Sequence, residues 1–373
     1  MDSVRRNQVG TTANSVQLRR KDQKKVVVPT NSKMQLHTNL PLVSICIPTY
    51  NSSAYLKETL DSLVKQTYRP IEIIISDNCS TDNTCEIVSL FTNKLDIKLY
   101  KSDKNIGPEG NFNKVVSYAE GVYVAIYHSD DVYESNTVQL QVERLINNPN
   151  IALVFTNYVT IDERGRIISR RKISKAITCE VGLGYKEFLL EVIRSYGQII
   201  CTPSAMLPAQ IYKQHLPYNW GEFNSAADLD LWLRVSVNHR VAFISQPCLK
   251  YRISRTHGSF TTRLLRTRPA DFFNVIDTRI KCGEKINWSD RNILEFYRDI
   301  DRKRCVINHL ILNGLKHPYP RWVSFGLKNL WSSCIIPPKM LIYWLVASFF
   351  VNINLIWRFN WFRRLISRLL YGA

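Results

Sequence analysis

A short apolar run that ends at two adjacent carboxylates restricts the fold of this chain most strongly. Residues 123–127 read Tyr-Val-Ala-Ile-Tyr, and the sequence continues through His128 and Ser129 to Asp130 and Asp131. A bounded apolar run of this length predicts a buried strand. Because open α/β sheets bind ligands at the carboxyl ends of their strands, the two carboxylates are expected at a ligand site. Taken alone, such a pair is more often a turn or the cap of the next helix.

Segments with strand and helix patterns alternate along the first part of the chain. Apolar runs predict strands at 43–47, 71–75, 97–100 and 123–127, and helical periodicity predicts intervening helices at 54–66, 84–91 and 110–119. Such alternation in short units is typical of an α/β fold with a mainly parallel sheet.

Polar residues follow three of these predicted strands. They are Thr49, Tyr50 and Asn51 after the first, Asp77 and Asn78 after the second, and Asp130 and Asp131 after the fourth. Because parallel strands end at the same edge of a sheet, these side chains are expected to converge. Two carboxylates on a rigid strand end suit Mg²⁺ or Mn²⁺, which usually completes its shell with substrate phosphates. This convergence favours a ligand site over a turn or cap.

The second part of the chain predicts further elements. They are a helix at 137–147, a strand at 151–156, a turn at 162–166, a helix at 185–196, a strand at 203–207, a helix at 228–238, a strand at 241–244 and helical segments within 264–330.

Five segments, in order along residues 41–260, resemble the inverting glycosyltransferases of family 2, which have the GT-A fold. The segments are 43–51, 74–84, 105–123 together with the acidic motif at 129–131, 227–234 and 251–252. Five ordered motifs make a specific signal. The sequences of segments 74–84 and 111–116 most resemble those of bacterial transferases of surface-polysaccharide sugars, including abequosyltransferase-like ones.

The resemblance implies roles for individual residues. It implies that a nucleotide-sugar donor is bound by Pro48, Thr49, Tyr50, Asn51, Asp77, Asn105, Gly107, Ser129 and Asp130. Within that set, Asp77 would accept a hydrogen bond from the base edge. Asp130 would ligate a divalent cation, Mn²⁺ or Mg²⁺, with Asp131 in support and His257 as a further ligand. Asp228 would be the general base that deprotonates the acceptor hydroxyl, and Asp230 is its competitor for that role.

Three positions depart from the pattern of the family. His128 stands where many relatives have Asp, and Ala227 stands where many have Glu. Ser254 occupies the place of a frequent His, and His257 lies further along the chain. The first and third departures concern the expected cation site.

The positive charge is concentrated at the two ends of the chain. The net charge is +19, and residues 1–40 together with 302–373 carry 17 of those charges. The end at 302–373 is also rich in Trp, Phe, Leu and Ile, and 340–357 contains no charged residue. This pattern favours an anionic membrane surface as a partner, with 357–370 as an interfacial helix. The alternative is a soluble helix pair that packs on the domain.

These features predict four parts: a disordered basic arm at 1–40, a GT-A domain at 41–262, a helical extension at 263–334 and membrane-associated helices at 335–373. Nine scattered Cys without a CxxC pair indicate a reducing compartment. The expected location is the cytoplasmic face of the cell (inner) membrane. A lipid-linked saccharide is then the expected acceptor, in polysaccharide biosynthesis.

Two other functions compete with glycosyl transfer. A nucleotidyltransferase uses a similar sheet and cation, but usually needs a Gly-rich, basic phosphate loop after the first strand, which Pro48–Ser53 is not. A non-enzymatic nucleic-acid-binding protein would carry basic residues throughout its core. Because residues 41–301 carry a net charge of only +2, no nucleic-acid partner is expected.

Overall fold

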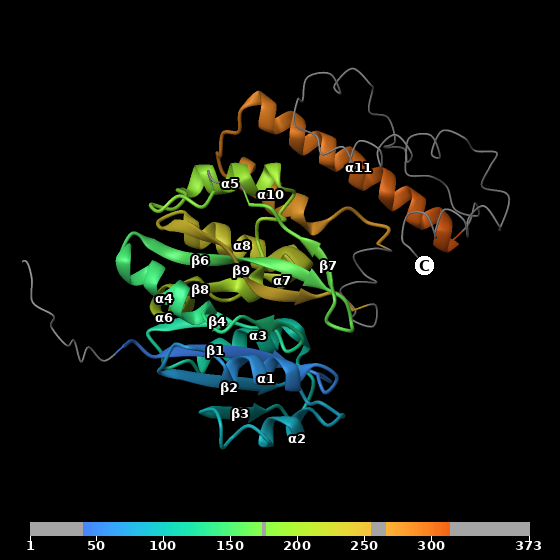
Figure 1. The fold of residues 1–373 in the computed structure, drawn as a ribbon. Coiled ribbons are helices and arrows are strands. Elements are labelled where there is room, and N and C mark those ends of the chain that lie inside the picture. The colour runs from blue at the N-terminus through green and yellow to red at the C-terminus, as the bar shows by residue number, and fades with distance from the viewer. Residues whose placement is uncertain (1–39, 174–176, 255–265, 314–373) are drawn as a thin grey trace, which may run out of the picture. The chain divides into compact units, whose positions relative to one another are not determined.

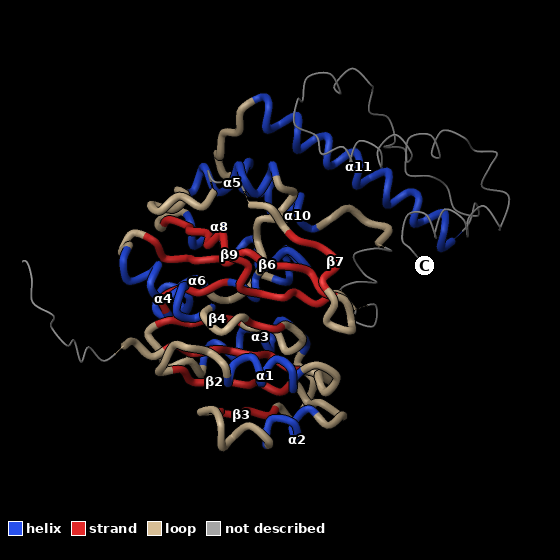
Figure 2. Tube along the Cα trace, viewed as in Figure 1, coloured by secondary structure: helices blue, strands red, loops and turns tan. Residues whose placement is uncertain are grey.

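The structure is a computed structural model that describes residues 40–173, 177–254 and 266–313. Helices pack against the two faces of a sheet in this part of the chain (Figures 1 and 2). The predicted α/β fold class is confirmed. The basic arm, His257 and the segment at 335–373 lie outside the described residues.

The first half of the sheet is parallel, as predicted. Its strands run in the order β3-β2-β1-β4. The strands are β1 Val43–Thr49, β2 Ile71–Asp77, β3 Ile97–Lys101 and β4 Tyr123–Ile126, and the helices between them are α1 Leu56–Val64, α2 Thr84–Ser89 and α3 Gly107–Ser117. The register places Thr49 beside Asp77 at the last paired position of β1 and β2.

The second half of the sheet mixes strand directions. β8 is antiparallel to both β4 and β6, whereas β6 and β9 are parallel to one another. The strands are β5 Val132–Tyr133, β6 Ile151–Ile161, β7 Ile167–Arg170, β8 Ala205–Pro208 and β9 Arg240–Arg252. The helices are α4 Thr137–Asn147, α5 Tyr185–Arg194, α6 Ala209–His215, α7 Trp220–Phe223 and α8 Ala227–Ser236, with 3-10 turns at Thr202–Ser204 and Asn224–Ala226.

Two predicted strands are longer than their apolar runs. The strand predicted at 241–244 is β9, which extends to Arg252, and the one predicted at 151–156 is β6, which extends to Ile161. The added residues pair with each other, and β9 also pairs with β5. Neither β5 nor β7 was predicted, because β5 has only two residues and all four residues of β7 are exposed.

The hydrophobic core lies on both faces of the sheet. All seven residues of β2 are buried, and the alternating Ile73 and Ile74 belong to different clusters on its two faces. Because both faces of such a parallel strand are covered, its sequence is a nearly continuous apolar run. The buried carboxylate near its start, Glu72, accepts hydrogen bonds from Ser44 and from Lys98, the latter at 2.9 Å.

Two further helices continue this core beyond the predicted domain boundary at 262. They are α10 Asp271–Lys281 and α11 Trp288–Asn313. Phe273, Ile276 and Leu294 are buried in the same cluster as Trp232 of α8. Among the described residues, no helix combines the length and the apolar character needed to cross a bilayer.

Truncating Ile74 tests the two-faced packing of β2. Ile74 is fully buried, so Ile74→Ala should lower the free energy of unfolding by about 2–5 kcal/mol in chemical denaturation. The control is Ile168→Ala on β7, where the side chain is 57% exposed and the change should stay within about 0.5 kcal/mol. Equal effects of the two substitutions would contradict this account of the core.

Candidate active site

The acidic motif forms a tight turn between β4 and β5. The backbone N–H of Tyr127 donates to the Cys46 carbonyl at 2.9 Å, and the N–H of His128 donates to the Tyr133 hydroxyl at 2.9 Å. The Thr59 hydroxyl of α1 donates to the Asp131 carbonyl at 2.8 Å. The turn is therefore fixed from β1, β5 and α1 together.

Arg252, at the end of β9, holds the same turn from the other side. Its backbone N–H donates to Asp131 Oδ1 at 2.8 Å, and its Nε donates to the Asp130 carbonyl at 2.8 Å. The guanidinium is buried, pairs with Glu58 and lies 4.5 Å from the centre of the Tyr55 ring. Thus the second member of the Tyr251-Arg252 motif acts on the acidic turn, a role that the sequence did not predict.

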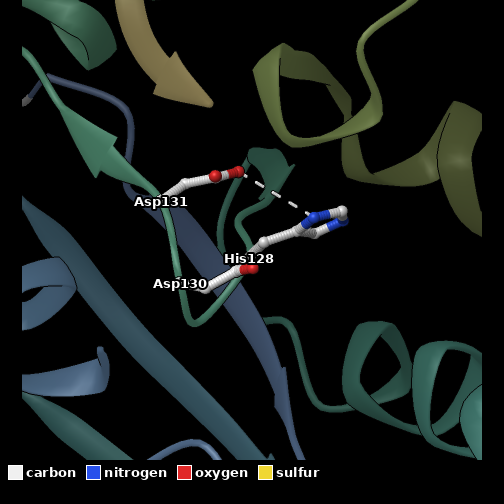
Figure 3. A group of neighbouring side chains, drawn as sticks. All are labelled: His128, Asp130 and Asp131. Atoms are coloured by element: carbon white, nitrogen blue, oxygen red, sulfur yellow. Dashed lines mark ion pairs between the residues drawn. The ribbon is translucent and has the colours of Figure 1, made fainter. Parts of the chain in front are cut away.

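His128, Asp130 and Asp131 form a group suited to a metal ion. One potential ligand atom from each lies within 4.8 Å of the others. Figure 3 shows His128 and Asp131 directed toward one another, with 3.9 Å between Nδ1 and Asp131 Oδ2. The group lies where the sequence places the cation, and His128 replaces the expected acid as a third donor.

The environment of Asp131 fits a bound cation. Its side chain is fully buried, and Oδ2 has no hydrogen-bond donor among the described residues. Burial and the neighbouring Asp130 raise the pKa of Asp131 well above its usual value, against the opposing effect of Arg252. A cation beside this carboxylate would offset the desolvation of its charge. One imidazole and two carboxylates are ligand types found in Mn²⁺ sites.

Asp77 lies at the carboxyl end of β2, within a network of hydroxyl groups. Its Oδ1 accepts hydrogen bonds from the hydroxyls of Thr49 at 3.1 Å and Ser80 at 2.5 Å, and its Oδ2 accepts from the Ser80 N–H at 3.0 Å. A carboxylate offers about four acceptor positions, so capacity for one further donor remains. Asp77 is only 2% exposed.

The loop after β1 joins this network to the acidic turn. Its Asn51 adopts a positive φ of 48°, donates from its N–H to the Ser80 hydroxyl at 2.9 Å, and accepts from the Thr81 N–H at 2.9 Å. The hydroxyls of Ser52 and Ser129 lie 2.8 Å apart. Pro48 is half-buried and Tyr50 is 49% exposed. The three strand ends therefore converge as the alternation of strands predicted.

Asn105 and Gly107 belong to a second loop at this edge. The Asn105 side-chain oxygen accepts from the Asn78 amide at 2.9 Å and from the Gly107 N–H at 2.8 Å. Gly107 has a φ of 76°, which favours glycine, and α3 begins there rather than at the predicted Gly110. Further along α3, the buried Asn111 donates to the Ser76 carbonyl at 3.0 Å. These contacts tie α3 to the ends of β1 and β2.

Asp228 lies in the first turn of α8 and is half-buried. The Thr202 hydroxyl donates to its Oδ2 at 2.7 Å, and the Leu229 N–H donates to its Oδ1 at 2.8 Å. The indole N–H of Trp232 donates to the same Thr202 hydroxyl at 3.2 Å. The Thr202 hydroxyl thus accepts a hydrogen bond from the indole and uses its own single proton to donate to Asp228.

Asp230 is placed differently from Asp228. It is 3% exposed and pairs with Arg234 at 2.8 Å and with Arg279. A buried carboxylate between two guanidinium groups serves the packing of α8 against α10. The geometry therefore favours Asp228 over its competitor.

Aromatic side chains connect the acidic turn with α8. The Phe112 ring lies 5.9 Å from the His128 ring and 6.0 Å from the Tyr218 ring, and Tyr218 in turn lies 6.4 Å from Trp232. This row of rings runs from the group of His128, Asp130 and Asp131 to α8, the helix that carries Asp228. The sequence assigned no role at this site to His128, Arg252 or Thr202. His128 stood out only as a departure within the acidic motif and Arg252 only as part of the motif at 251–252, whereas Thr202 gave no signal.

Asp82 lies between β2 and α2, and its Oδ2 accepts a hydrogen bond from the Ser53 N–H of the loop after β1 at 3.0 Å. Burial alone would raise the pKa of Asp82, but hydrogen bonds from Thr84 and Ser53 hold it at about 2. A lowered pKa contributes stability that is present above the unfolded value of 3.8 and is lost as the pH falls toward 2. The difference in unfolding free energy between the wild type and Asp82→Asn should therefore be largest above pH 4 and shrink from there toward pH 2.

The matched control is Asp103→Asn, at an exposed loop position, which should change stability by less than about 0.5 kcal/mol throughout. Chemical denaturation at stepped pH measures both variants. A difference for Asp82→Asn that does not vary with pH would contradict the role assigned to the carboxylate.

The sequence matches the family described as glycosyl transferase family 2 over residues 44–216. An uncharacterized glycosyltransferase of Methanocaldococcus jannaschii is 33% identical over 239 residues, which are 63% of this chain and 78% of that protein. WfgD of Escherichia coli, named as a UDP-Glc:α-D-GlcNAc-diphosphoundecaprenol β-1,3-glucosyltransferase, is 27% identical over 58% of this chain and 78% of its own length. The similarity to chondroitin synthase of Pasteurella multocida, 27% identical over 67% of this chain, spans only 24% of that longer enzyme.

The fold is also found among solved structures. A mannosyltransferase from Pyrobaculum calidifontis, solved in complex with GDP-Man and Mn²⁺, superposes with a TM-score of 0.51 at 13% identity, over 90% of this chain and 89% of that one. This likeness confirms the predicted GT-A fold. The family match and the archaeal relative together show that this chain belongs to glycosyltransferase family 2.

Proposed function

We propose that this glycosyltransferase catalyses metal-dependent, inverting transfer of a sugar from a nucleotide-sugar to a lipid-linked saccharide in polysaccharide biosynthesis. The observation that carries the proposal is the convergence of the three strand ends on the His128, Asp130 and Asp131 group. Support for the acceptor comes from WfgD, whose name specifies a diphosphoundecaprenol-linked sugar. Support for the cation comes from the mannosyltransferase solved with GDP-Man and Mn²⁺.

On the donor side, the network at the ends of β1 and β2 would bind the nucleoside. Asp77 has capacity to accept one N–H from the base edge, and Thr49 and Ser80 hold its carboxylate in place. The exposed ring of Tyr50 and the half-buried Pro48 offer apolar surface to the base. The diphosphate of the donor would then lie toward Ser129 and Asp130.

His128, Asp130 and Asp131 would hold the divalent cation. When bound, Mn²⁺ or Mg²⁺ supplies neutralising charge to the departing nucleoside diphosphate. The residues of the chain provide the geometry, since Arg252 and Thr59 fix the backbone of the turn before any ligand arrives. Such preorganisation spares the site a reorganisation cost during the reaction.

On the acceptor side, Asp228 would remove the proton from the attacking hydroxyl. The acceptor oxygen forms a bond to the anomeric carbon while the bond to the nucleoside diphosphate breaks, and Asp228 takes the proton. A single displacement of this kind inverts the anomeric centre. The hydrogen bonds from Thr202 and Leu229 hold the Asp228 carboxylate in position at the start of α8.

We further propose that the enzyme acts at the cytoplasmic face of the cell membrane. The support is the composition of residues 335–373, which contain no Asp or Glu and repeat Arg among Trp, Phe and Leu. A helix with this pattern binds an anionic lipid surface through its basic face and the acyl boundary through its apolar face. A lipid-linked acceptor would be presented at the same surface.

Nucleotide binding tests the donor and cation sites. Calorimetry with UDP, GDP, CDP and dTDP on the full chain in detergent should show binding of one nucleotide that requires Mn²⁺. Asp130→Ala should weaken that binding at least about tenfold, because a charged ligand of the cation is lost. Asp61→Ala on α1, a matched loss of an exposed carboxylate, should leave it unchanged. Binding that needs no metal and persists in Asp130→Ala would refute the assigned site.

Isosteric substitution of Asp228 tests the general base. Asp228→Asn preserves the shape of the side chain but removes its basicity, so kcat should fall about 10²–10⁴-fold while donor affinity is kept. Asp230→Asn is the comparison, because it removes a carboxylate of the same helix that pairs with Arg234 and Arg279. It should lower the unfolding temperature and leave kcat within a few-fold. Retention of activity in Asp228→Asn would exclude this residue as the base.

A further inference from the structure

A cavity of about 590 Å³ lies between the β6–β7 hairpin and the chain that follows α5. Tyr158 and Thr160 contribute to it from β6, and Ser169 contributes from β7. Gln198 and Ile199 close it from the segment after α5. None of the strand-end residues assigned to the donor lines this cavity, so it is separate from the donor site.

The charged side chains that the described residues contribute to the lining are all positive. They are Arg170, Arg171 and Lys172, and no carboxylate from the described part of the chain lines the cavity. Within the described residues, none of the three forms an ion pair with an acidic side chain, in contrast to Arg194 and Arg298, which do. Uncompensated cations around a concave space attract an anionic ligand.

Arg171 is held in position by contacts that leave its positive charge without an acidic partner among the described residues. Its Nη1 donates to the Ile199 carbonyl at 3.3 Å, and its guanidinium lies 5.2 Å from the centre of the Tyr158 ring. The Asn157 amide donates to the Arg171 carbonyl at 3.2 Å and so fixes the backbone as well. A guanidinium anchored in this way keeps its charge and further N–H donors for a ligand.

The remaining polar groups match a phosphate. Tyr158, Thr160, Ser169 and Ser195 add hydroxyls, and Gln198 adds an amide. Hydroxyls and guanidinium groups together are the donors that bind the many acceptor oxygens of a phosphate or diphosphate. The volume exceeds that of a single phosphate and admits a diphosphate with part of an attached sugar.

The segment that closes the cavity leads to a residue that contacts Asp228, the proposed general base. Ile199 is three residues before Thr202, whose hydroxyl donates to Asp228 at 2.7 Å. Three residues of chain span at most about 11 Å. On its other side, the Tyr158 ring lies 5.9 Å from that of Tyr251, which immediately precedes Arg252. A group bound here would thus lie beside the acceptor side of the reaction.

We propose that this cavity binds the diphosphate that links the acceptor saccharide to its lipid. The inference rests on the proposed function, which supplies the acceptor class, and adds the residues that recognise its anionic part. Arg171 and Lys172 bind the diphosphate oxygens, and the terminal sugar of the acceptor reaches toward Asp228.

Calorimetry on the full chain in detergent, with metal chelated, tests the site with defined probes. The probes are inorganic pyrophosphate, a soluble prenyl diphosphate and glucuronate. Both diphosphates should bind the wild type, and the double variant Arg171→Gln with Lys172→Gln should bind them at least about tenfold more weakly. The matched control, Arg164→Gln with Lys281→Gln, removes the same charge at exposed positions outside the cavity and should bind them like the wild type.

A separate measurement keeps this inference distinct from the proposed function. Mn²⁺-dependent nucleotide binding should be equal in the wild type and in both double variants, and the unfolding temperatures should agree within a few degrees. Loss of nucleotide binding with Asp130→Ala alone concerns the donor site and not this cavity.

Four results would overturn the inference. They are absence of diphosphate binding to the folded wild type, equal weakening in both double variants, displacement of pyrophosphate by nucleotide, and binding of glucuronate in place of both diphosphates. A folded cavity variant that binds nucleotide but has lost the diphosphates would support it.

Discussion

The buried guanidinium of Arg252 is the contact on which the geometry of this site depends. It lies at the end of β9 and joins elements that are far apart in sequence: its side chain donates to the carbonyls of Asp130 and Asp162 and pairs with Glu58 of α1. Its own backbone N–H fixes Asp131. A buried charge is costly unless it is paired and hydrogen-bonded, and here Glu58 supplies the opposite charge while the acidic turn supplies one of the acceptor carbonyls. The orientation of the turn and the burial of this arginine therefore require one another.

The sheet explains why polar groups can be held so rigidly at its edge. β1 and β2 are buried along most of their length, and their register brings Thr49 beside Asp77 where the two strands end. Packing on both faces fixes the strands, and the hydroxyl and amide contacts then only need to orient the last residues. This is why a network of small side chains, including Ser80, Asn51 and Ser52, suffices to join three loops.

Sequence patterns predicted the parts of this structure that depend on local order. The parallel strands, most of the helices and the convergence of Asp77 with the acidic turn follow from apolar periodicity and the rule for parallel strand ends. The long course of β9, the short β5 and the role of Arg252 depend on contacts between residues far apart in the sequence, as Ile161 pairs with Arg252 and Val132 pairs with Lys250. Such pairing leaves no local periodic signal. For the same reason Thr202 could not be connected with Asp228 before the fold was known.

The distribution of charge distinguishes the proposed donor site from the proposed acceptor cavity. Residues 41–301 are nearly neutral overall, and arginines such as the half-buried Arg234 and the buried Arg252 pair with carboxylates there. Arg170, Arg171 and Lys172 are three cations in succession without acidic partners among the described residues, and they border a cavity. The proposed donor site instead brings two carboxylates together, in the group of His128, Asp130 and Asp131. A reaction between a nucleotide-sugar and a diphosphate-linked acceptor brings two strongly anionic molecules together. Separate neutralisation of each, by a cation on one side and by side chains on the other, would let them approach without mutual repulsion.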